Sequence, residues 1–402
     1  MRRRVVITGM GAVTALGLGV DTLWQAARDG RSGVKPIEFS RGDPLRIKIA
    51  AHFPDFDPAP LLGRNIIAST DRFAAFALVA ADEACKQGRI LPGEVDERCG
   101  VIVGSGIGGV GTVEDGCYMF YVSKGRADPM TIPKVMPNAA ASHISMRYGA
   151  RGPSFCVSSA CSSAAQAIGL GLFLIRAGLI DRAIVGGAEA LLSPAVLRAW
   201  ELLRVLTPTA CRPFSQNRDG MVLGEGAGIL IIEALESAEK RGVPIIAELA
   251  GYGTTSDAAD LLRPDPQGAQ RAMDFAIADA GLTPNDIGYV NAHGTATVLN
   301  DITETQALAA VFGDALKRTP VSSTKPIHGH TLGAAGAIEL IISIKAVLDQ
   351  IVPPTVNWLG PDPKCDLDAV PGHSRPVEMT AALSNSFAFG GINASLVVRR
   401  FA

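Results

Sequence analysis

The sequence predicts a layered α/β fold, and three observations support this prediction. Short runs of aliphatic and β-branched residues bounded by glycine recur along the 402 residues. Longer stretches with helical spacing lie between many of these runs. Hydrophobic residues make up 48% of the chain and charged residues 19%, a balance that suits a compact enzyme with a substantial core. Such alternation is typical of mostly parallel, buried sheets covered by helices.

The expected strands are short and apolar, as strands buried on both faces are. They cover Arg4–Thr8, Gly100–Gly104, Ala183–Gly187, Gly228–Glu233, Ile245–Leu249, Ile287–Asn291, Ala382–Ser386 and Ala394–Arg399. The expected helices lie between them. They cover Asp71–Gln87, Ser162–Ala177, Gly268–Ala280, Ile302–Phe312 and Ala334–Gln350.

A break near Arg241-Gly242-Val243-Pro244 suggests two domains, residues 1–243 and 244–402. Each side would hold several strands and helices, which hints at two similar halves. We interpret the stretches rich in proline and glycine at 129–137, 208–220 and 353–372 as long functional loops and not as flexible linkers.

Charge and cysteine content exclude several function classes. The formal net charge of −2 gives no reason to expect nucleic acid or an anionic membrane as partner. No apolar run reaches the ~20 residues that span a bilayer. Seven cysteines at irregular spacing argue against a disulfide framework and against a zinc CxxC pair. We therefore expect a cytoplasmic protein, and the apolar surplus favours a homo-oligomer.

Cys161 stands in the segment Val157–Ala164, which is made almost wholly of small residues and precedes a predicted helix. The positive end of the helix dipole would stabilise a thiolate and lower the pKa of the cysteine. Small neighbours leave room for a substrate carbonyl, and free N–H groups could hold an oxyanion. A buried, inert cysteine is the alternative, and Cys156 is an example of one. Context makes Cys161 the candidate nucleophile.

Two of the six histidines stand where α/β folds keep their active sites. His293 follows an apolar strand and has the hydroxyls of Thr295 and Thr297 nearby. His330 lies just ahead of the last long helix, whose N-terminus disfavours an imidazolium. We therefore expect a neutral His330 that can donate a hydrogen bond.

Lys325 precedes this second histidine by a few residues. It could be a solvated loop cation, or its ammonium could pair with an acid such as Glu304 and polarise the site. His328-x-His330 could instead offer two ligands to a metal ion. No Asp, Glu or Cys accompanies them at a familiar spacing, which favours nucleophilic chemistry over metal catalysis.

Two glycine-rich segments have competing interpretations. The segment Gly104–Gly109 follows a strand and matches the GxGxxG pattern of dinucleotide sites. No convincing amphipathic helix is expected over 110–116, so we favour a turn that lets Ile107 approach a narrow pocket over a nicotinamide site. The segment Ser384–Asn393 joins two strands, and its amides could complete an oxyanion hole. A tight strand connection is the alternative.

Taken together, these segments resemble the β-ketoacyl-[acyl carrier protein] synthases of the thiolase superfamily, especially synthase II, over essentially the whole chain. The resemblance is carried by Ser-Ala-Cys-Ser-Ser at 159–163, Asn-Ala-His-Gly-Thr at 291–295, and Gly-His-Thr-Leu-Gly-Ala-Ala-Gly at 329–336. Further matches are Val5–Gly11, Cys211–Phe214, Gly224–Gly228 and Phe389–Gly391. It implies a duplicated five-layer αβαβα fold and an active homodimer.

The resemblance also implies an acyltransferase (EC 2.3.1 class) that catalyses a decarboxylative Claisen condensation in fatty-acid elongation. Cys161 would accept an acyl group from acyl carrier protein as a thioester. His293 and His330 would stabilise the enolate formed as the malonyl thioester loses carbon dioxide, and this carbanion would attack the acyl group. The backbone amides of Cys161 and Phe389 would hold the oxyanion.

Supporting roles follow from the same resemblance. Lys325, with Asp301 and Glu304 nearby, would orient and tune the histidines. Thr295 and Thr297 match hydroxyls that bind the phosphopantetheine arm, which arrives on the carrier protein, so no cofactor of the enzyme's own is expected.

Three further assignments are implied. Phe389 matches a gating phenylalanine, and Ile107 would line the acyl pocket. A structural monovalent cation, K⁺ or Na⁺, would be held by Asn291, Glu339, Ser384 and Asn385.

One departure bears on the substrate, because the family usually has Gly-Phe-Gly-Gly where this chain has Ala388 before Phe389. With Cys365–Asp368, this pattern is similar to nodulation-type ketosynthases, so a specialised ketosynthase, of nodulation or polyketide type, is the alternative function. The nucleophile argues against an inactive chain-length factor. A thiolase would need a second catalytic cysteine near its end, and Cys365 stands outside any such loop.

Overall fold

The computed structural model describes residues 2–42, 45–126 and 128–401. The first half contributes the strands β1 (Val5–Thr14), β2 (Gly17–Leu18), β3 (Val34–Pro36), β4 (Ile49–Ala51), β5 (Cys99–Gly104), β6 (Ser154–Val157), β7 (Arg182–Glu189) and β8 (Gly226–Ala234). The second half contributes β9 (Ala247–Ser256), β10 (Ile287–Asn291), β11 (Val321–Ser322), β12 (Ile351–Val352), β13 (Arg375–Pro376), β14 (Ala381–Ala388) and β15 (Ile392–Arg399).

The helices alternate with these strands. Those of the first half are α1 (Val20–Asp29), α2 (Ala59–Leu62), α3 (Arg64–Ile67), α4 (Arg72–Gln87), α5 (Val110–Tyr121), α6 (Thr131–Val135), α7 (Ala139–Tyr148), η1 (Ala160–Ser162), α8 (Ser163–Arg176), α9 (Pro194–Leu202) and α10 (Leu235–Arg241). Those of the second half are α11 (Pro266–Asp279), η2 (Pro284–Asp286), α12 (Val298–Phe312), η3 (Gly313–Lys317), α13 (Lys325–His328), η4 (Leu332–Ala334) and α14 (Ala335–Asp349).

The main strands form one mixed sheet whose two halves repeat the same topology. Its order is β11-β10-β14-β15-β9-β1-β8-β7-β5-β6. In the first half β6, β5 and β7 run parallel and β8 runs antiparallel to β7. In the second half β11, β10 and β14 run parallel and β15 runs antiparallel to β14. The repeat agrees with the expected duplication.

The prediction of a mostly parallel sheet was wrong in one respect. The central strands β8, β1, β9 and β15 are all paired antiparallel. The two halves meet where β1 pairs with β9 at Val6 and Ile7. The central strands are nevertheless buried, which is why their sequences are as apolar as those of parallel strands.

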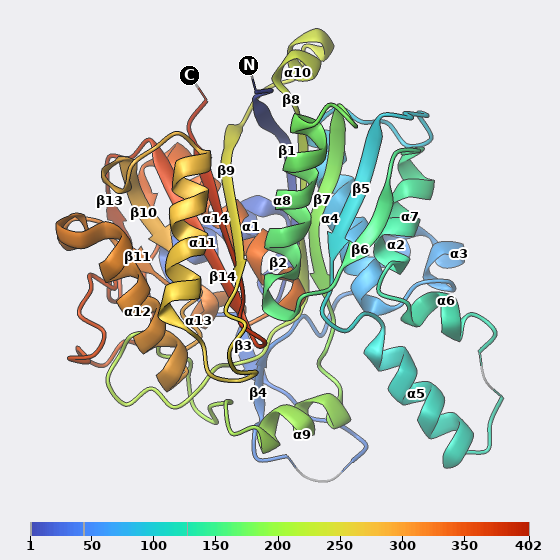
Figure 1. Ribbon diagram of the computed structural model, residues 1–402. Helices are drawn as coiled ribbons and strands as arrows, with labels where there is room; N and C mark the ends of the chain where they lie inside the picture. The colour runs from blue at the N-terminus through green and yellow to red at the C-terminus, as the bar shows by residue number, and fades with distance from the viewer. Residues whose placement is uncertain (1, 43–44, 127, 402) are drawn as a thin grey trace.

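Helices cover both faces of each half of the sheet and create five layers. The helices α4 and α7 pack on the outer face of the first half, and α11 packs on the outer face of the second, with α12 beside it. Figure 1 shows these two outer layers on the right and the left. The helices α8 and α14 pack on the inner faces and contact each other, so they form the central layer.

The hydrophobic core follows these layers. The largest cluster joins α8 and α14 to the inner faces of both halves, with Ile168, Leu172, Ile338 and Ile341 buried at its centre. Two further clusters lie under the outer helices of the first and second halves. Because the central layer is sealed by apolar side chains on both sides, the starts of α8 and α14 are held in register with each other.

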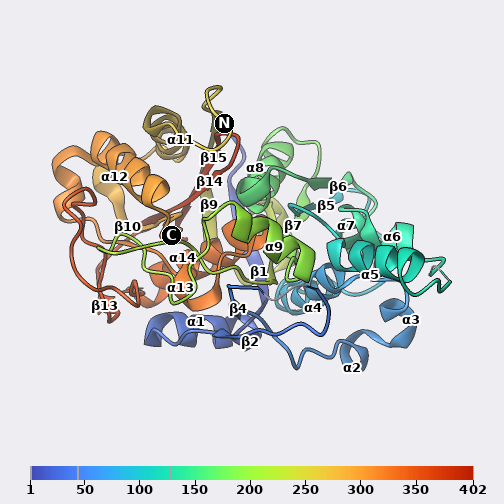
Figure 2. The ribbon, with the colours of Figure 1, turned by 90° about the horizontal axis from the view of Figure 1, so that it is seen from below.

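The predicted elements agree with the observed ones within a few residues, with two exceptions. β1 extends to Thr14 and β9 to Ser256, beyond the predicted ends. A helix, α5, follows the glycine-rich segment Gly104–Gly109, where no convincing helix was expected. Figure 2 shows α5 and α6 at the edge of the first half and α9 nearer the middle. The domain boundary at 243/244 stays a prediction.

Within the described ranges, no helix is both long enough and apolar enough to cross a membrane.

Candidate active site

Cys161 lies in the turn η1, directly before α8, as the small-residue run predicted. The Oγ of Ser163 donates to the carbonyl of Ala160 at 2.7 Å and accepts from the amide of Ser159 at 2.9 Å, so this serine caps the turn. The Oγ of Ser162 donates to the carbonyls of Ser386 and Ile392 at 2.9 and 2.8 Å. The turn of the cysteine is therefore bound to β14 and β15 of the other half.

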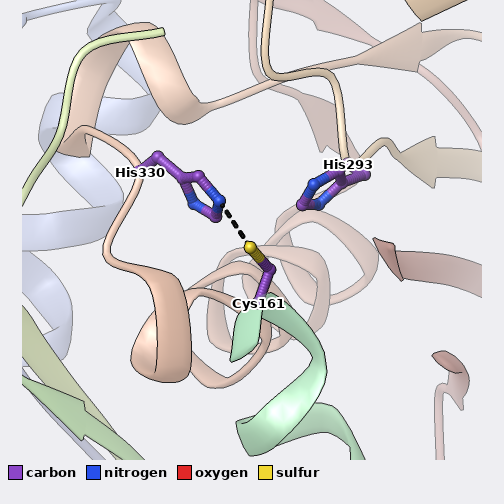
Figure 3. Close-up of side chains that lie close together, drawn as sticks. All are labelled: Cys161, His293 and His330. Atoms are coloured by element: carbon purple, nitrogen blue, oxygen red, sulfur yellow. Dashed lines mark hydrogen bonds between the residues drawn. The ribbon is translucent and has the colours of Figure 1, made fainter. Parts of the chain in front are cut away.

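His330 reaches the sulfur from the loop between α13 and η4. Its Nε2 lies 3.1 Å from the Sγ of Cys161 (Figure 3). Its amide donates to the carbonyl of Val222 at 2.7 Å, and its carbonyl accepts from the amide of Gly224 at 2.9 Å. The backbone of this histidine is thus clamped by a segment of the first half.

His293 faces the same sulfur from the end of β10, as Figure 3 shows. Its ring centroid lies 5.3 Å from that of His330, with the planes 82° apart. One ligand atom from each of Cys161, His293 and His330 lies within 4.8 Å of the other two. The structure thus brings together the two histidines and the cysteine that the sequence analysis singled out, while His328 points elsewhere, toward the Oγ1 of Thr324 at 3.0 Å.

Burial controls the protonation of all three groups. It lowers the pKa of His293 and His330 well below 6.5, and the charge of Lys325 lowers both further. Both imidazoles are therefore neutral, although burial rather than the helix N-terminus is the main cause for His330.

The expectation of a cysteine with a lowered pKa was wrong. Burial raises the pKa of the Cys161 thiol to about 12, the charge of Lys325 opposes this rise, and the charges of Glu339 and Glu189 add to it. With 6% of its surface exposed, the sulfur loses more from desolvation than the helix dipole restores. The resting group is a thiol in contact with a neutral imidazole.

Lys325 is neither a solvated loop cation nor the partner of Glu304, the two alternatives that the sequence offered, because it pairs with Glu339. Its Nζ lies 2.5 Å from the Oε1 of Glu339, and both side chains are fully buried. Glu304 instead accepts the amides of His293 and Gly294, each at 2.8 Å. Lys325 thus supplies a buried positive charge near the histidines, and Glu304 holds the backbone of one of them.

Asp301 supports the adjoining turn. It accepts the amide of Phe214 at 2.8 Å and that of Ala296 at 3.2 Å, and it lies 3.5 Å from the guanidinium of Arg218. Burial raises its pKa to about 6. Since Ala296 has a positive φ of 64°, these bonds stabilise a turn that presents Thr295 to the site.

A cavity of about 280 Å³ opens onto the three groups. Its lining includes Thr295 and Thr297, whose Oγ1 atoms are 2.9 Å apart. It also includes Phe389, which stacks on Trp200 with centroids 5.8 Å apart and planes at 21°. Ile107 is not among the lining residues and is 37% exposed.

The residues expected to hold a monovalent cation differ in whether their oxygen atoms already have hydrogen-bond partners. Within the described ranges, the buried Oδ1 of Asn291 and Oε2 of Glu339 lack hydrogen-bond partners. Two such oxygens fit a K⁺ or Na⁺ ion. The Oδ1 of Asn385 already accepts from the Oγ of Ser395 at 2.8 Å, so this residue fits less well. Ser384 is buried beside them on β14.

Sequence reasoning missed three residues. Trp200 carried no motif, and Arg218 lies in a loop that had been noted only for its composition. Glu189 left a signal, because it is a carboxylate at the end of the otherwise apolar strand Ala183–Ala188. It accepts amides of the glycine-rich loop, which leaves that loop without the free amides that a dinucleotide phosphate would need.

Two family models match the chain, "Beta-ketoacyl synthase, N-terminal domain" over residues 2–238 and "Beta-ketoacyl synthase, C-terminal domain" over residues 246–358. The chain belongs to the β-ketoacyl synthase family. It is therefore a transferase-class condensing enzyme, and its five-layer architecture is the thiolase-like fold.

Two relatives with similar sequence identity to this chain carry different names. The chain is 44% identical to nodulation protein E of Rhizobium sp. (strain N33), over 100% of both chains. It is 41% identical to 3-oxoacyl-[acyl-carrier-protein] synthase 2 of Staphylococcus aureus (strain N315), over 99% of both.

Solved structures of ketosynthases have the same fold. The ishigamide ketosynthase/chain length factor matches with a TM-score of 0.95 and 32% identity, over 100% of both chains. A type II polyketide ketosynthase in complex with its acyl-carrier protein matches with a TM-score of 0.91 and 32% identity, also over 100% of both. Both fatty-acid and specialised ketosynthases are thus represented among the similar proteins.

Proposed function

We propose that this β-ketoacyl synthase joins an acyl chain held on Cys161 to malonyl-acyl carrier protein and releases carbon dioxide and β-ketoacyl-acyl carrier protein. The observation that carries the proposal is the contact of the sulfur with the Nε2 of His330 at 3.1 Å, with His293 beside it at the end of a cavity. A thiol and two neutral imidazoles are the groups that acyl transfer and enolate stabilisation require.

The first step loads the acyl group. The sulfur attacks the thioester carbonyl, a new C–S bond forms, and the C–S bond to the carrier breaks. Because burial holds the Cys161 thiol protonated, its proton must pass to the neutral His330 in contact with it and then to the departing thiolate. The amides of Cys161 and Phe389 would hold the oxyanion.

The second step forms the carbon–carbon bond. Neutral His293 and His330 donate N–H groups to the malonyl thioester oxygen, and the electrons of the breaking C–C bond pass into the enolate as carbon dioxide leaves. The enolate carbon attacks the acyl carbonyl, the bond to Cys161 breaks, and the sulfur takes up a proton. Burial keeps the imidazoles neutral and the charge of Lys325 adds to this effect, while Glu304 holds the backbone of His293.

The carrier protein would deliver its phosphopantetheine arm through the cavity. Thr295 and Thr297 line this cavity and would offer their hydroxyls to the arm, and Phe389, which also lines it, would act as the gate. The similarity to a ketosynthase that binds its acyl-carrier protein supports the same class of partner here. No resident cofactor is needed, and a K⁺ or Na⁺ ion near Asn291 and Glu339 would neutralise buried oxygens.

The proposed condensation serves two kinds of pathway, housekeeping fatty-acid elongation and specialised acyl-chain synthesis. One observation favours the second, because the methyl of Ala388 packs into the apolar cluster that contains Cys161 and Trp200. This methyl would restrict the gate formed by the next residue. A product profile with carrier-bound acyl chains of graded length would separate the two.

A second copy of the chain is the proposed oligomeric partner. β6 stands at the end of the sheet, and α5 exposes large apolar side chains, among them Phe120 at 68% and Tyr121 at 75%. A homodimer would cover them. Light scattering on the purified protein measures its mass in solution, and a monomeric mass at the concentration of the assay would refute the proposed homodimer. We place the enzyme in the cytoplasm, where acyl carrier proteins act.

The function is tested by incubating the protein with acyl-carrier protein and malonyl-carrier protein. We expect an acyl adduct on Cys161 by mass spectrometry and a β-ketoacyl product. If the wild-type chain forms no adduct with an acyl group of any length tested, the proposed function is refuted.

A further inference from the structure

The glycine-rich loop after β5 encloses a carboxylate of the chain itself. Glu189, the last residue of β7, accepts the amides of Gly106 at 2.6 Å and Ile107 at 3.3 Å, and the Oγ of Ser105 at 3.2 Å. Successive N–H groups in such a turn form an anion site. The dinucleotide-like pattern is therefore satisfied by an internal anion.

The same carboxylate reaches the loop of the second histidine. The amide of Gly333 donates to the Oε2 of Glu189 at 3.0 Å, and Gly333 lies three residues beyond His330 in the chain. A Cβ at position 106 would come within 2.9 Å of that oxygen, and one at position 333 would collide with it. Glycine at both positions is what lets the two loops close on one side chain.

The enclosing loop also borders the nucleophile. The amide of Ser105 donates to the carbonyl of Val157 at 3.1 Å, and the Oγ of Ser158 donates to the carbonyl of Gly106 at 3.3 Å. A Cβ at position 106 would lie 3.9 Å from the Cα of Ala160. Glu189 is thus connected to the segment that carries Cys161 on one side and to the segment that carries His330 on the other.

We propose that Glu189 is a positioning residue that holds the Cys161 turn and the His330 loop in one frame, so that Sγ and Nε2 stay in contact. This inference rests on the proposed function for its reaction. It also bears on the acyl chain, because the same carboxylate fixes the backbone of Ile107, which lies outside the cavity lining but in the loop that borders the Cys161 segment.

The groups around Glu189 favour its ionised form. Burial raises its pKa to about 7, while the four hydrogen bonds that it accepts lower it. Each partner is a donor, so a carboxylate satisfies all four. An amide side chain would turn an NH₂ group toward at least one N–H and would push one of the loops away.

The test compares Glu189→Gln with Glu233→Gln. Glu233 is also fully buried, on the neighbouring strand β8, but it stands at the opposite end of the β7–β8 pair from Glu189, where it accepts from Thr8 at 2.6 Å and Arg241 at 2.7 Å. A displacement of ~1 Å between reacting groups costs on the order of 100-fold in rate. We expect Glu189→Gln to lower the kcat of condensation by on the order of 10- to 100-fold, with the KM for malonyl-carrier protein unchanged and the length profile of acyl loading altered. Glu233→Gln keeps the wild-type kcat.

Ser105→Ala is the second variant, because it removes one donor and leaves the carboxylate with three. It should lower kcat a few-fold at constant KM while the thermal midpoint stays near wild type. If Glu189→Gln fails to fold, an unchanged kcat in Ser105→Ala overturns the inference. A folded Glu189→Gln with wild-type kcat and length profile overturns it as well. Absent condensation in the wild type and in Glu233→Gln would instead count against the proposed function.

Discussion

Removing the charge of Lys325 should destabilise the protein in a manner that depends on pH. In Lys325→Met, the fully buried Glu339 loses the ammonium at 2.5 Å. Leaving one partner of a buried ion pair uncompensated costs about 3–5 kcal/mol, and we expect a loss of this size in the free energy of unfolding at pH 8. Urea titration followed by the fluorescence of the three tryptophans measures it.

The sign of the pH dependence follows from Glu339. Burial raises the pKa of this carboxyl from 4.5 to about 7 in the folded state, and the charge of Lys325 opposes the rise. Between the unfolded pKa of about 4.3 and the folded pKa of about 7, the folded chain holds a proton that the unfolded chain has released. The free energy of unfolding therefore falls as the pH rises from about 4.3 to about 7. Without Lys325 the pKa rises further, and the loss should be largest at pH 8 and less than half as large at pH 5.

Lys345→Met is the matched control, because Lys345 lies on α14, is 19% exposed, and only approaches Asp21 and Asp349, each at 4.0 Å. It should cost less than about 1 kcal/mol. The double variant Lys325→Met/Glu339→Leu should recover most of the stability, since it removes the isolated charge. A loss below about 1 kcal/mol in Lys325→Met at pH 8, or an equal loss at pH 5, would refute the reasoning.

The remaining predictions concern catalysis. Cys161→Ala should abolish self-acylation, and an acyl adduct elsewhere in this variant, seen by peptide mass spectrometry, would displace Cys161 as nucleophile. Cys161→Gln should release carbon dioxide from malonyl-carrier protein without condensation, because the amide mimics the acylated sulfur; retained condensation would contradict this. His293→Ala should lose at least about 100-fold in carbon dioxide release, the size expected when a donor to the developing negative charge is removed, and full activity would take His293 out of the mechanism. Ala388→Gly should change the rate or the chain-length preference of acyl loading, which a graded acyl series measures, with an unchanged profile as the contrary result.

The sequence by itself determined the family, the main strands and helices, and the three groups that meet at the candidate site. Cys161, His293 and His330 were predictable because each stands in a run of small residues at the junction of a loop with a strand or helix. Local pattern is enough for such positions, since small neighbours at a junction of this kind leave space beside the side chain wherever the fold places it.

Tertiary structure alone decided which charges meet and how each group is protonated. Lys325 pairs with Glu339, fourteen residues later on α14, because the folded chain brings the start of α13 against α14, and spacing along the chain could not favour this acid over Glu304. The pKa of Cys161 was predicted in the wrong direction because the sequence shows the helix that follows the cysteine, and hence its dipole, but does not show how deeply the sulfur is buried. Desolvation of the sulfur depends on all the layers that cover it. Glu189 was overlooked for the same reason: its four donors come from two segments far apart in the sequence, 105–107 and Gly333, and only the packed fold brings them to one carboxylate.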